Sequence, residues 1–193
     1  MKFIEYYAKW FGRIAHTYIG QKRKYTGEWY FSHTEAVHDI VMAHGGTPEQ
    51  GAAAYLHDYR EDVVTWLKAR NKTIVLFVFE WFYNLFPASV RKLVNELTDV
   101  YTSENYPQTK RAIRKSFEAG RIAKISNEAK LIKLADLFHN TESIVSQDEK
   151  FAIVYLKEKF VIMKGLHGSG SPELYAKVEN QLKESIDKLK VIV

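Results

Sequence analysis

The sequence predicts an all-α protein that forms a single domain over residues 1–193. Three observations support this prediction. Apolar residues recur at the three- and four-residue spacing of amphipathic helices, and residues that typically begin helices recur along the chain. No stretch shows the alternation of apolar and polar residues that marks a half-buried strand. A chain of this length can bury one substantial core, and no repeat or linker divides it.

Residues 2–19 are predicted to form an amphipathic helix, because their aromatic and aliphatic residues recur at helical spacing. A basic, turn-rich loop follows over residues 20–31. Ser32 and Glu35 then match the capping-box pattern Ser-x-x-Glu. This pattern predicts a helix over residues 33–44.

The next helix is predicted to begin at Thr47 and Pro48, a capping residue followed by proline at the first helical position. Its small residues 52–54 allow close packing against a neighbouring helix. A short helix is expected over residues 63–69, and a very apolar one over residues 74–86. We favour an added core helix for this apolar segment, with an oligomer contact or a lid beside the site as the alternative. It is too short to span a bilayer.

Five further helices are predicted in the remainder of the chain. Proline marks the start of three of them, and an asparagine is expected to cap a fourth. The last of the five is expected over residues 172–190. The predicted starting residues are Pro87, Pro107, Asn127, Asp148 and Pro172.

The composition restricts the classes of partner and compartment. The net charge of +5 favours an anionic partner. Because the basic residues are scattered along the helices, we expect a small molecule rather than a nucleic acid. The absence of cysteine excludes disulfides and thiolate metal sites, and it agrees with a cytoplasmic protein. The first residues contain no apolar core of a secretion signal, so a cytoplasmic location without a membrane partner is expected.

Charged residues with catalytic potential gather in one short segment. His57 and Asp58 end an apolar stretch, and Glu61 and Asp62 follow. In a helix, residues three and four apart share a face, which would place His57 beside Glu61 and Asp58 beside Asp62. Such a group is costly to hold together unless a cation neutralises it. Taken alone, however, the segment is more simply interpreted as a solvated acidic helix end.

Two distant residues favour a metal site over that simpler interpretation. His33 lies at a predicted helix start, and Asp136 lies on an otherwise apolar helix face. With His57 and Asp58 they supply two imidazole nitrogens and two carboxylates. This mixed set of ligands suits Mn²⁺, Fe²⁺ or Zn²⁺.

The order His, His-Asp and distant Asp resembles the HD-domain metal-dependent phosphohydrolases. Within that family, the chain most resembles the hydrolase domain of RelA/SpoT homologues. This resemblance extends from about residue 4 to about residue 165. The chain looks similar to stand-alone small alarmone hydrolases, such as the metazoan SpoT homologue. The matching segments, in family order, are Ala15-His16, Gly20 to His33, Leu56 to Asp62, Leu97 to Asp99, and Lys133 to Asn140.

The resemblance implies a helical bundle around one metal, most simply Mn²⁺, held by His33, His57, Asp58 and Asp136. It implies that Glu61 and Asp62 position or deprotonate the attacking water and transfer a proton. The implied reaction removes the 3′-pyrophosphate of the stringent-response alarmones ppGpp or pppGpp. The products are GDP or GTP and pyrophosphate.

Basic residues supply the expected substrate contacts. Arg23 and Lys24 precede the first ligand, where a phosphate-handling site needs cations, although solvated loop charge is the alternative. By resemblance, Lys110 and Arg111 are candidates for phosphate contacts, and a solvated helix face explains them equally well. Asn140 is expected to hydrogen-bond the ribose or a phosphate.

Several alternative functions remain open at this stage. The same metal ligands would suit another HD nucleotide phosphohydrolase, such as an NADPH 2′-phosphatase, a ppApp hydrolase, a nucleotidase or a dNTP hydrolase. A non-catalytic nucleotide-binding module is the alternative from a different class. Either a monomer or a homo-oligomer is compatible with the sequence.

Overall fold

The computed structural model describes residues 2–147, 149–167 and 170–190, and it describes side chains outside 144–150 and 190. Every regular element in these ranges is a helix. The only extended pairing within them is one isolated antiparallel bridge between Lys22 and Trp29. The all-α prediction is therefore confirmed. None of the described helices has both the length and the apolar character that crossing a bilayer requires.

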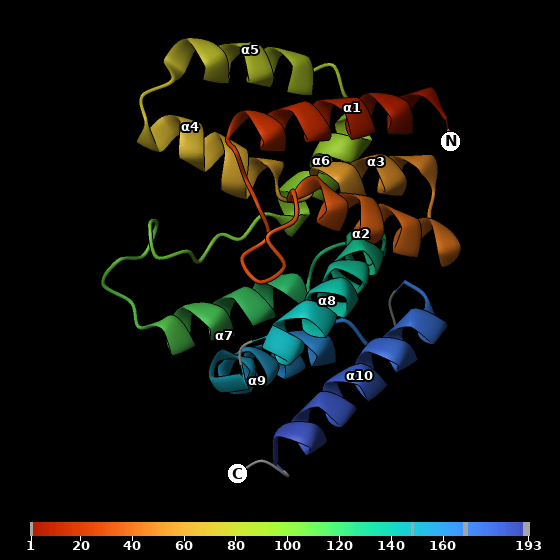
Figure 1. Cartoon of the computed structure of the whole chain (residues 1–193). Coiled ribbons are helices and arrows are strands. Elements are labelled where there is room, and N and C mark those ends of the chain that lie inside the picture. Colours follow the sequence, from red (N-terminus) through yellow and green to blue (C-terminus); the bar gives the residue numbers. More distant parts are fainter. Residues whose placement is uncertain (1, 148, 168–169, 191–193) are drawn as a thin grey trace. The chain divides into compact units, whose positions relative to one another are not determined.

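The chain divides into two compact units, Met1–Thr98 and Asp99–Val193. We describe each unit by itself, and the single-domain organisation expected from the sequence stays a prediction. Unit 1 contains six α-helices and one π-helical turn, η1, among its described residues (Figure 1). Its elements are α1 (Phe3–Tyr18), α2 (Phe31–Ala43), α3 (Pro48–Leu56), η1 (Tyr59–Val64), α4 (Thr65–Ala69), α5 (Thr73–Tyr83) and α6 (Ala88–Leu97).

Helix α3 is the centre of unit 1, because α1, α2 and α6 all pack against it. Its buried residues are mostly small, as the sequence predicted. The close approach is clearest at Gly12 of α1, where an added Cβ atom would lie 2.8 Å from the Tyr55 carbonyl oxygen. Thr47 caps α3 and Pro48 is its first residue, which confirms the predicted start.

Aromatic side chains fill the core between α1, η1 and α5. The Phe11 ring lies 5.1 Å from Tyr59, and Tyr59 stacks on Tyr83 at 4.9 Å. Helix α5 contributes Phe79 and Tyr83 to this core. The core-helix interpretation of the apolar segment therefore holds for one side of α5, while its other side is exposed to solvent.

The predicted start of α2 is wrong. The helix begins at Phe31, and its N-cap residue is Tyr30, so Ser32 lies inside the first turn rather than at the cap. The Ser32 hydroxyl contacts Glu28, and Glu35 pairs with Lys9 of α1. The preceding loop decides this start, because the Tyr30 N–H donates to the Gln21 carbonyl at 3.1 Å and places Tyr30 at the helix entrance.

A continuous α-helix was expected through the segment after His57, but the structure does not show one. Helix α3 ends at Leu56, and η1 begins at Tyr59. A π-helical turn has a wider hydrogen-bond repeat, and such turns often occur at functional sites. The expected proximity of His57 and Glu61 stays a prediction.

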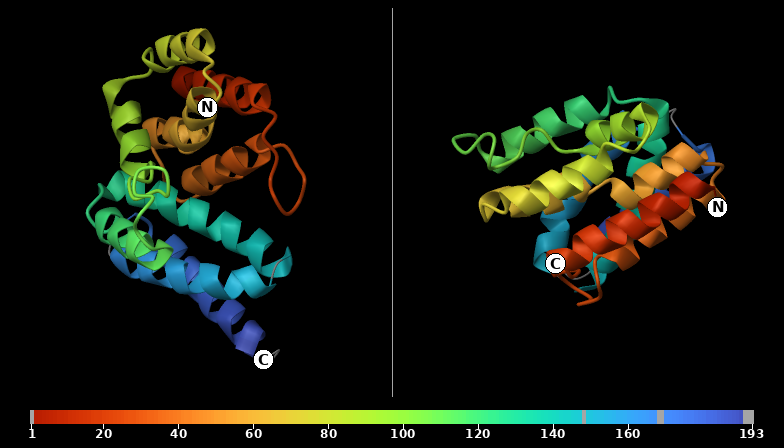
Figure 2. Two further views of the ribbon diagram at one scale, coloured as in Figure 1. Left: turned by 90° about the vertical axis from the view of Figure 1, so that its left-hand side faces the viewer. Right: turned by 90° about the horizontal axis from the view of Figure 1, so that it is seen from above.

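Unit 2 contains α7 (Arg111–Ile122), α8 (Asn127–Gln147), α9 (Glu149–Gly165) and α10 (Pro172–Lys190). Helix α9 packs against α7 and α8, and α10 packs against α8 and α9 (Figure 2). The apolar faces of these helices form the core of this unit. Its innermost residues include Ile122, Ile132, Ala135, Leu156, Leu166 and Val178.

Two predicted helix starts in unit 2 are corrected. Helix α7 begins four residues after Pro107, because the chain makes further turns there and the Thr109 carbonyl accepts a hydrogen bond from the Arg114 side chain. Ser126 rather than Asn127 caps α8, since its hydroxyl accepts from the Ala129 N–H at 3.3 Å. The predicted start at Asp148 lies outside the described residues.

Candidate metal centre

Three side chains of unit 1 come together as a possible metal site. His33 lies in the first turn of α2, and His57 and Asp58 form the turn between α3 and η1. One ligand atom from each lies within 4.8 Å of the other two. Asp58 Oδ2 is 2.9 Å from His57 Nε2 and 3.8 Å from His33 Nε2. Both imidazoles are buried, whereas the Asp58 carboxylate is partly accessible.

The hydrogen bond on the far side of the His57 ring defines which nitrogen faces the carboxylate. His57 Nδ1 lies 2.8 Å from the Ala54 carbonyl oxygen, which can only accept, so Nδ1 carries a hydrogen. In the neutral ring, Nε2 then presents a lone pair toward Asp58. Two electron-rich atoms at 2.9 Å need a proton or a cation between them. Backbone support of this kind is typical of metal-binding histidines, so the group fits a divalent ion.

Neutral side chains donate hydrogen bonds to Asp58 and to the nearby Asp62. The Tyr30 hydroxyl donates to Asp58 Oδ2. Gln21 Nε2 donates to Asp62 Oδ2 at 2.7 Å, and Gln21 Oε1 lies 2.7 Å from His16 Nδ1. Burial lowers the pKa of His16 to about 4, so this imidazole is neutral and donates its Nδ1 hydrogen to Gln21. His16, Gln21 and Asp62 are thus joined by a chain of two hydrogen bonds.

The loop before α2 positions two of these donors. The Arg23 N–H donates to the Glu28 carbonyl at 2.8 Å, which closes residues 21–30 into a hairpin. Gln21 and Tyr30, the residues that hold Asp62 and Asp58, pair at the base of this hairpin. His16, Gln21 and Tyr30 lie within the segments that resemble RelA/SpoT homologues, but no role was predicted for them from the sequence. Their place in those segments was the signal that could have identified them.

The Asp62 carboxyl has a pKa near neutral pH. Burial, followed by the neighbouring Asp58 charge, raises the pKa of Asp62 to about 7, although Gln21 and His57 oppose the rise. The Asp62 N–H also donates to the Asp58 carbonyl at 2.9 Å, so these two residues are neighbours as expected. A carboxyl that titrates near neutral pH can exchange protons at the pH of most cells. Glu61 lies beside it in η1 and is partly exposed.

The predicted substrate residues of unit 1 lie on the exposed part of the same hairpin. Lys24 is exposed, and its ammonium group lies 3.1 Å from the Tyr25 hydroxyl and over the Tyr25 ring. Arg23 is half-buried beside it. Their substrate contacts stay predictions.

Asp136, the predicted fourth ligand, lies in unit 2 on α8. Its Oδ2 accepts from Lys133 Nζ at 3.0 Å, and its Oδ1 accepts from Asn140 Nδ2 at 2.6 Å. In unit 2, therefore, the Asn140 amide orients Asp136. The expected contact of Asn140 with a substrate stays a prediction. The binding of a shared metal by Asp136 together with His33, His57 and Asp58 also stays a prediction.

Lysines surround the carboxylates of unit 2. Asp99 Oδ2 accepts from Lys115 Nζ at 3.0 Å. Burial alone would raise the pKa of Asp99, but the charges of Lys133 and Lys115 outweigh it and hold the pKa below its usual range. Lys159 belongs to the same cluster, and burial followed by the Lys133 charge lowers its pKa.

Lys110 and Arg111 lie at the start of α7. Lys110 is its exposed N-cap residue. The Arg111 guanidinium makes a two-point ion pair with Glu158 of α9 at 2.8 and 2.9 Å. Arg111 also lines a groove of about 460 Å³ together with Lys115 and Lys157. A phosphate contact by Arg111 would thus require sharing or exchange with Glu158.

Comparison with known families identifies the domain type. A family model described as the HD domain matches residues 11–159. The chain belongs to the HD-domain family. The predicted family is therefore confirmed, and the His57-Asp58 doublet lies within the matched residues.

A solved structure shares the fold of this HD-domain chain. It is described as a metazoan orthologue of SpoT that hydrolyses ppGpp and plays a role in starvation responses. The two chains are 22% identical, the TM-score is 0.74, and the match covers 95% of this chain and 96% of the other. A search of curated proteins found no match.

Proposed function

We propose that this HD-domain protein is a metal-dependent phosphohydrolase that removes the 3′-pyrophosphate of ppGpp and pppGpp. The products are GDP or GTP and pyrophosphate, and the metal is Mn²⁺. One observation carries the proposal: His57 Nε2 and Asp58 Oδ2 face each other at 2.9 Å, with His33 Nε2 close by, in a chain of the HD-domain family. Such a pair of electron-rich atoms is suited to a divalent cation.

The proposed ligands are His33, His57, Asp58 and Asp136. When bound, the ion makes water acidic enough to supply hydroxide near neutral pH. The Ala54 carbonyl keeps His57 Nε2 directed toward the proposed metal position, and the Tyr30 hydroxyl orients Asp58. The mixed nitrogen and oxygen ligands support Mn²⁺ over Mg²⁺ or Ca²⁺, which prefer oxygen ligands alone.

Asp62 and Glu61 have the proposed role of positioning the attacking water and accepting its proton. The pKa of Asp62, raised to about 7 by burial and by Asp58, supports this role, because an effective base has a pKa near the working pH. Gln21 fixes the direction of the Asp62 carboxylate through a 2.7 Å hydrogen bond. The neutral His16 in turn fixes the Gln21 amide.

Arg23 and Lys24 support a substrate with several phosphates. Both lie on the hairpin whose base holds the site residues Gln21 and Tyr30, and charge on a leaving pyrophosphate needs nearby cations. We propose that Lys110, Arg111 and Asn140 add contacts to the phosphates or ribose. The ppGpp-hydrolysing SpoT orthologue with the same fold supports the choice of a guanosine substrate.

The test is a substrate panel of ppGpp, pppGpp, ppApp, NADPH and dNTPs, incubated with Mn²⁺ and resolved by anion-exchange chromatography. We expect pyrophosphate and GDP from ppGpp, and no release after EDTA treatment. Cleavage of NADPH or dNTPs with intact ppGpp would retain the phosphohydrolase and change its substrate. No cleavage of any member would favour a nucleotide-binding module.

A further inference from the structure

Two helices of unit 1 expose large apolar side chains at helical spacing. The exposed fraction reaches 86% at Phe3, 81% at Ile74 and 71% at Phe77. On α1 the exposed residues are Phe3, Tyr6, Trp10, Ile14 and Tyr18. On α5 and just beyond it they are Ile74, Phe77, Val78, Trp81 and Leu85. Each set forms a continuous stripe along one side of its helix.

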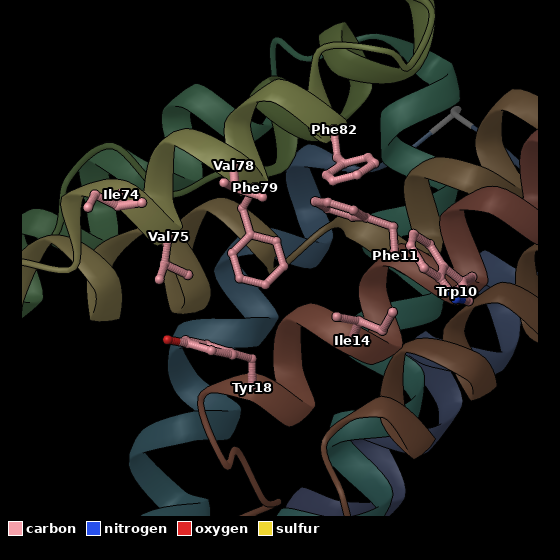
Figure 3. A pocket seen from close by; sticks show the side chains of 9 residues that line it. All are labelled: Trp10, Phe11, Ile14, Tyr18, Ile74, Val75, Val78, Phe79 and Phe82. Atoms are coloured by element: carbon pink, nitrogen blue, oxygen red, sulfur yellow. The ribbon is translucent and has the colours of Figure 1, made fainter.

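Three residues of the α1 stripe and two residues of the α5 stripe line one groove of about 280 Å³ (Figure 3). Phe11 and Phe79, whose rings lie 5.9 Å apart, form its floor. Trp10, Ile14 and Tyr18 line the side formed by α1, and Ile74, Val78 and Phe82 line the side formed by α5. We call the groove and the two stripes the α1–α5 face. An exposed apolar surface of this kind marks contact with another molecule or a membrane.

Cationic residues lie at both ends of the α1–α5 face. Lys2 and Lys72 are exposed directly before Phe3 and the start of α5. Arg70 stacks on the Trp66 ring at 4.2 Å, and Trp66 contacts Tyr18 edge to face. The accessible ends of the face are therefore cationic.

The carboxylates of the same two helices already have partners within unit 1. Glu5 is buried, with its Oε1 3.2 Å from His38 Nε2. Glu80 accepts a hydrogen bond from the Tyr59 hydroxyl at 3.0 Å and lies 3.9 Å from Arg60. These are the only acidic residues in α1 and α5. A second copy of this face would thus supply, from these helices, only carboxylates that already have partners to pair with the cations.

We propose that the α1–α5 face docks on the surface of an anionic phospholipid bilayer. Exposed tryptophan, tyrosine and phenylalanine beside lysine and arginine are the combination found at membrane interfaces. Anionic headgroups would pair with Lys2, Arg70 and Lys72, while the apolar stripes enter the acyl boundary. This contact is peripheral and does not cross the bilayer. It differs from the sequence-based expectation of no membrane partner. It does not depend on the proposed hydrolase activity.

The test measures co-sedimentation of the full-length protein with vesicles of phosphatidylcholine alone or with 30% phosphatidylserine, at about physiological and at high ionic strength. We expect binding to the phosphatidylserine vesicles that weakens in high salt, with a blue shift of tryptophan emission. Phe77→Ser combined with Trp81→Ser should weaken binding about tenfold or more. Phe117→Ser combined with Val161→Ser is the matched control, because both residues are more than half exposed in unit 2.

A charge reversal tests the cationic edge separately. Lys72→Glu should weaken binding to phosphatidylserine vesicles about tenfold, whereas Lys177→Glu on α10 should not. Unchanged melting curves would show that the variants are folded. Absence of binding, or equal binding by the face variants and their controls, would overturn the proposal. Concentration-dependent dimerisation that Phe77→Ser and Trp81→Ser abolish, without vesicle binding, would overturn it in favour of self-association.

Discussion

The two units hold their carboxylates in opposite ways. In unit 1, neutral groups donate to them: the Tyr30 hydroxyl to Asp58 and the Gln21 amide to Asp62. In unit 2, ammonium groups donate to them, with Lys115 bound to Asp99 and Lys133 bound to Asp136. The pKa values follow this difference, since the pKa of Asp62 is raised to about 7 and that of Asp99 is lowered.

This contrast shows how a cation-binding site is prepared. A neutral donor orients a carboxylate but leaves its negative charge in place, so neighbouring carboxylates repel each other until a cation arrives. A lysine neutralises its partner directly. The group of unit 1 therefore has the electrostatics of a site that receives an ion, whereas Asp136 would have to share or exchange its contact with Lys133 to bind one.

The largest effect is expected from His57→Gln. It removes an imidazole ligand and should lower both bound Mn²⁺ and phosphohydrolase turnover, the latter by at least about 10³-fold, because the ion supplies several kcal/mol of transition-state stabilisation. Elemental analysis after desalting and turnover assays measure the two effects. His44→Gln is the matched control, since its Nδ1 also contacts a backbone carbonyl, that of Ile40, at 2.8 Å. Unchanged metal content in His57→Gln would contradict the site.

Asp136→Asn tests whether unit 2 supplies a metal ligand. If Asp136 is the fourth ligand, this variant should also lose metal. Full retention of the ion by Asp136→Asn would restrict the ligands to unit 1 and remove Asp136 from the proposed set.

A smaller effect is expected from Glu61→Gln and Asp62→Asn. Each should lower turnover by about 10²-fold while metal content stays near normal, because general acid–base catalysis contributes at this scale. Glu49→Gln on α3 serves as the control. Wild-type turnover in both variants would exclude Glu61 and Asp62 from the mechanism.

Gln21→Met tests the neutral donor of Asp62. Loss of this outer contact should lower kcat about tenfold. The Gln21 hydrogen bond lowers the pKa of Asp62, so its loss should also move the acidic limb of the pH–rate profile to higher pH. The exposed Gln108→Met variant should change neither quantity. A lowered kcat with an unmoved profile would indicate a structural role only.

The last expected effect concerns stability alone. Between about pH 4 and 7, folded Asp62 retains a proton that the unfolded chain has lost, so its contribution to stability falls as pH rises. In metal-free protein, the unfolding free energy of wild type relative to Asp62→Asn should fall by about 1 kcal/mol per pH unit in this window. Denaturant titrations at several pH values measure it, with the exposed Asp187→Asn as control. The lowered pKa of His16, about 4, makes stability rise with pH, but this contribution is the same in wild type and Asp62→Asn and cancels in their difference. A constant difference would contradict the raised pKa.

The sequence alone predicted the helical class, most helix positions and the family. Periodic apolar residues and caps such as Thr47-Pro48 are local signals, so the chain determines them without long-range contacts. His33, His57 and Asp58 were also identified from their order, and they come together in unit 1. The start of α2 was predicted wrongly because a hairpin contact between Gln21 and Tyr30 decides it, and no capping pattern records such a contact.

Only the tertiary structure decided the roles of the groups around the site. The tautomer of His57 depends on the Ala54 carbonyl, and the pKa of Asp62 depends on burial and on Asp58. The apolar segment over residues 74–86 illustrates the same limit, because its composition does not tell which side is buried. Packing against α1 and η1 buries Phe79 and Tyr83 and leaves Trp81 exposed. Burial, tautomer and pKa are properties of the surroundings of a residue, and those surroundings come from segments distant in the chain.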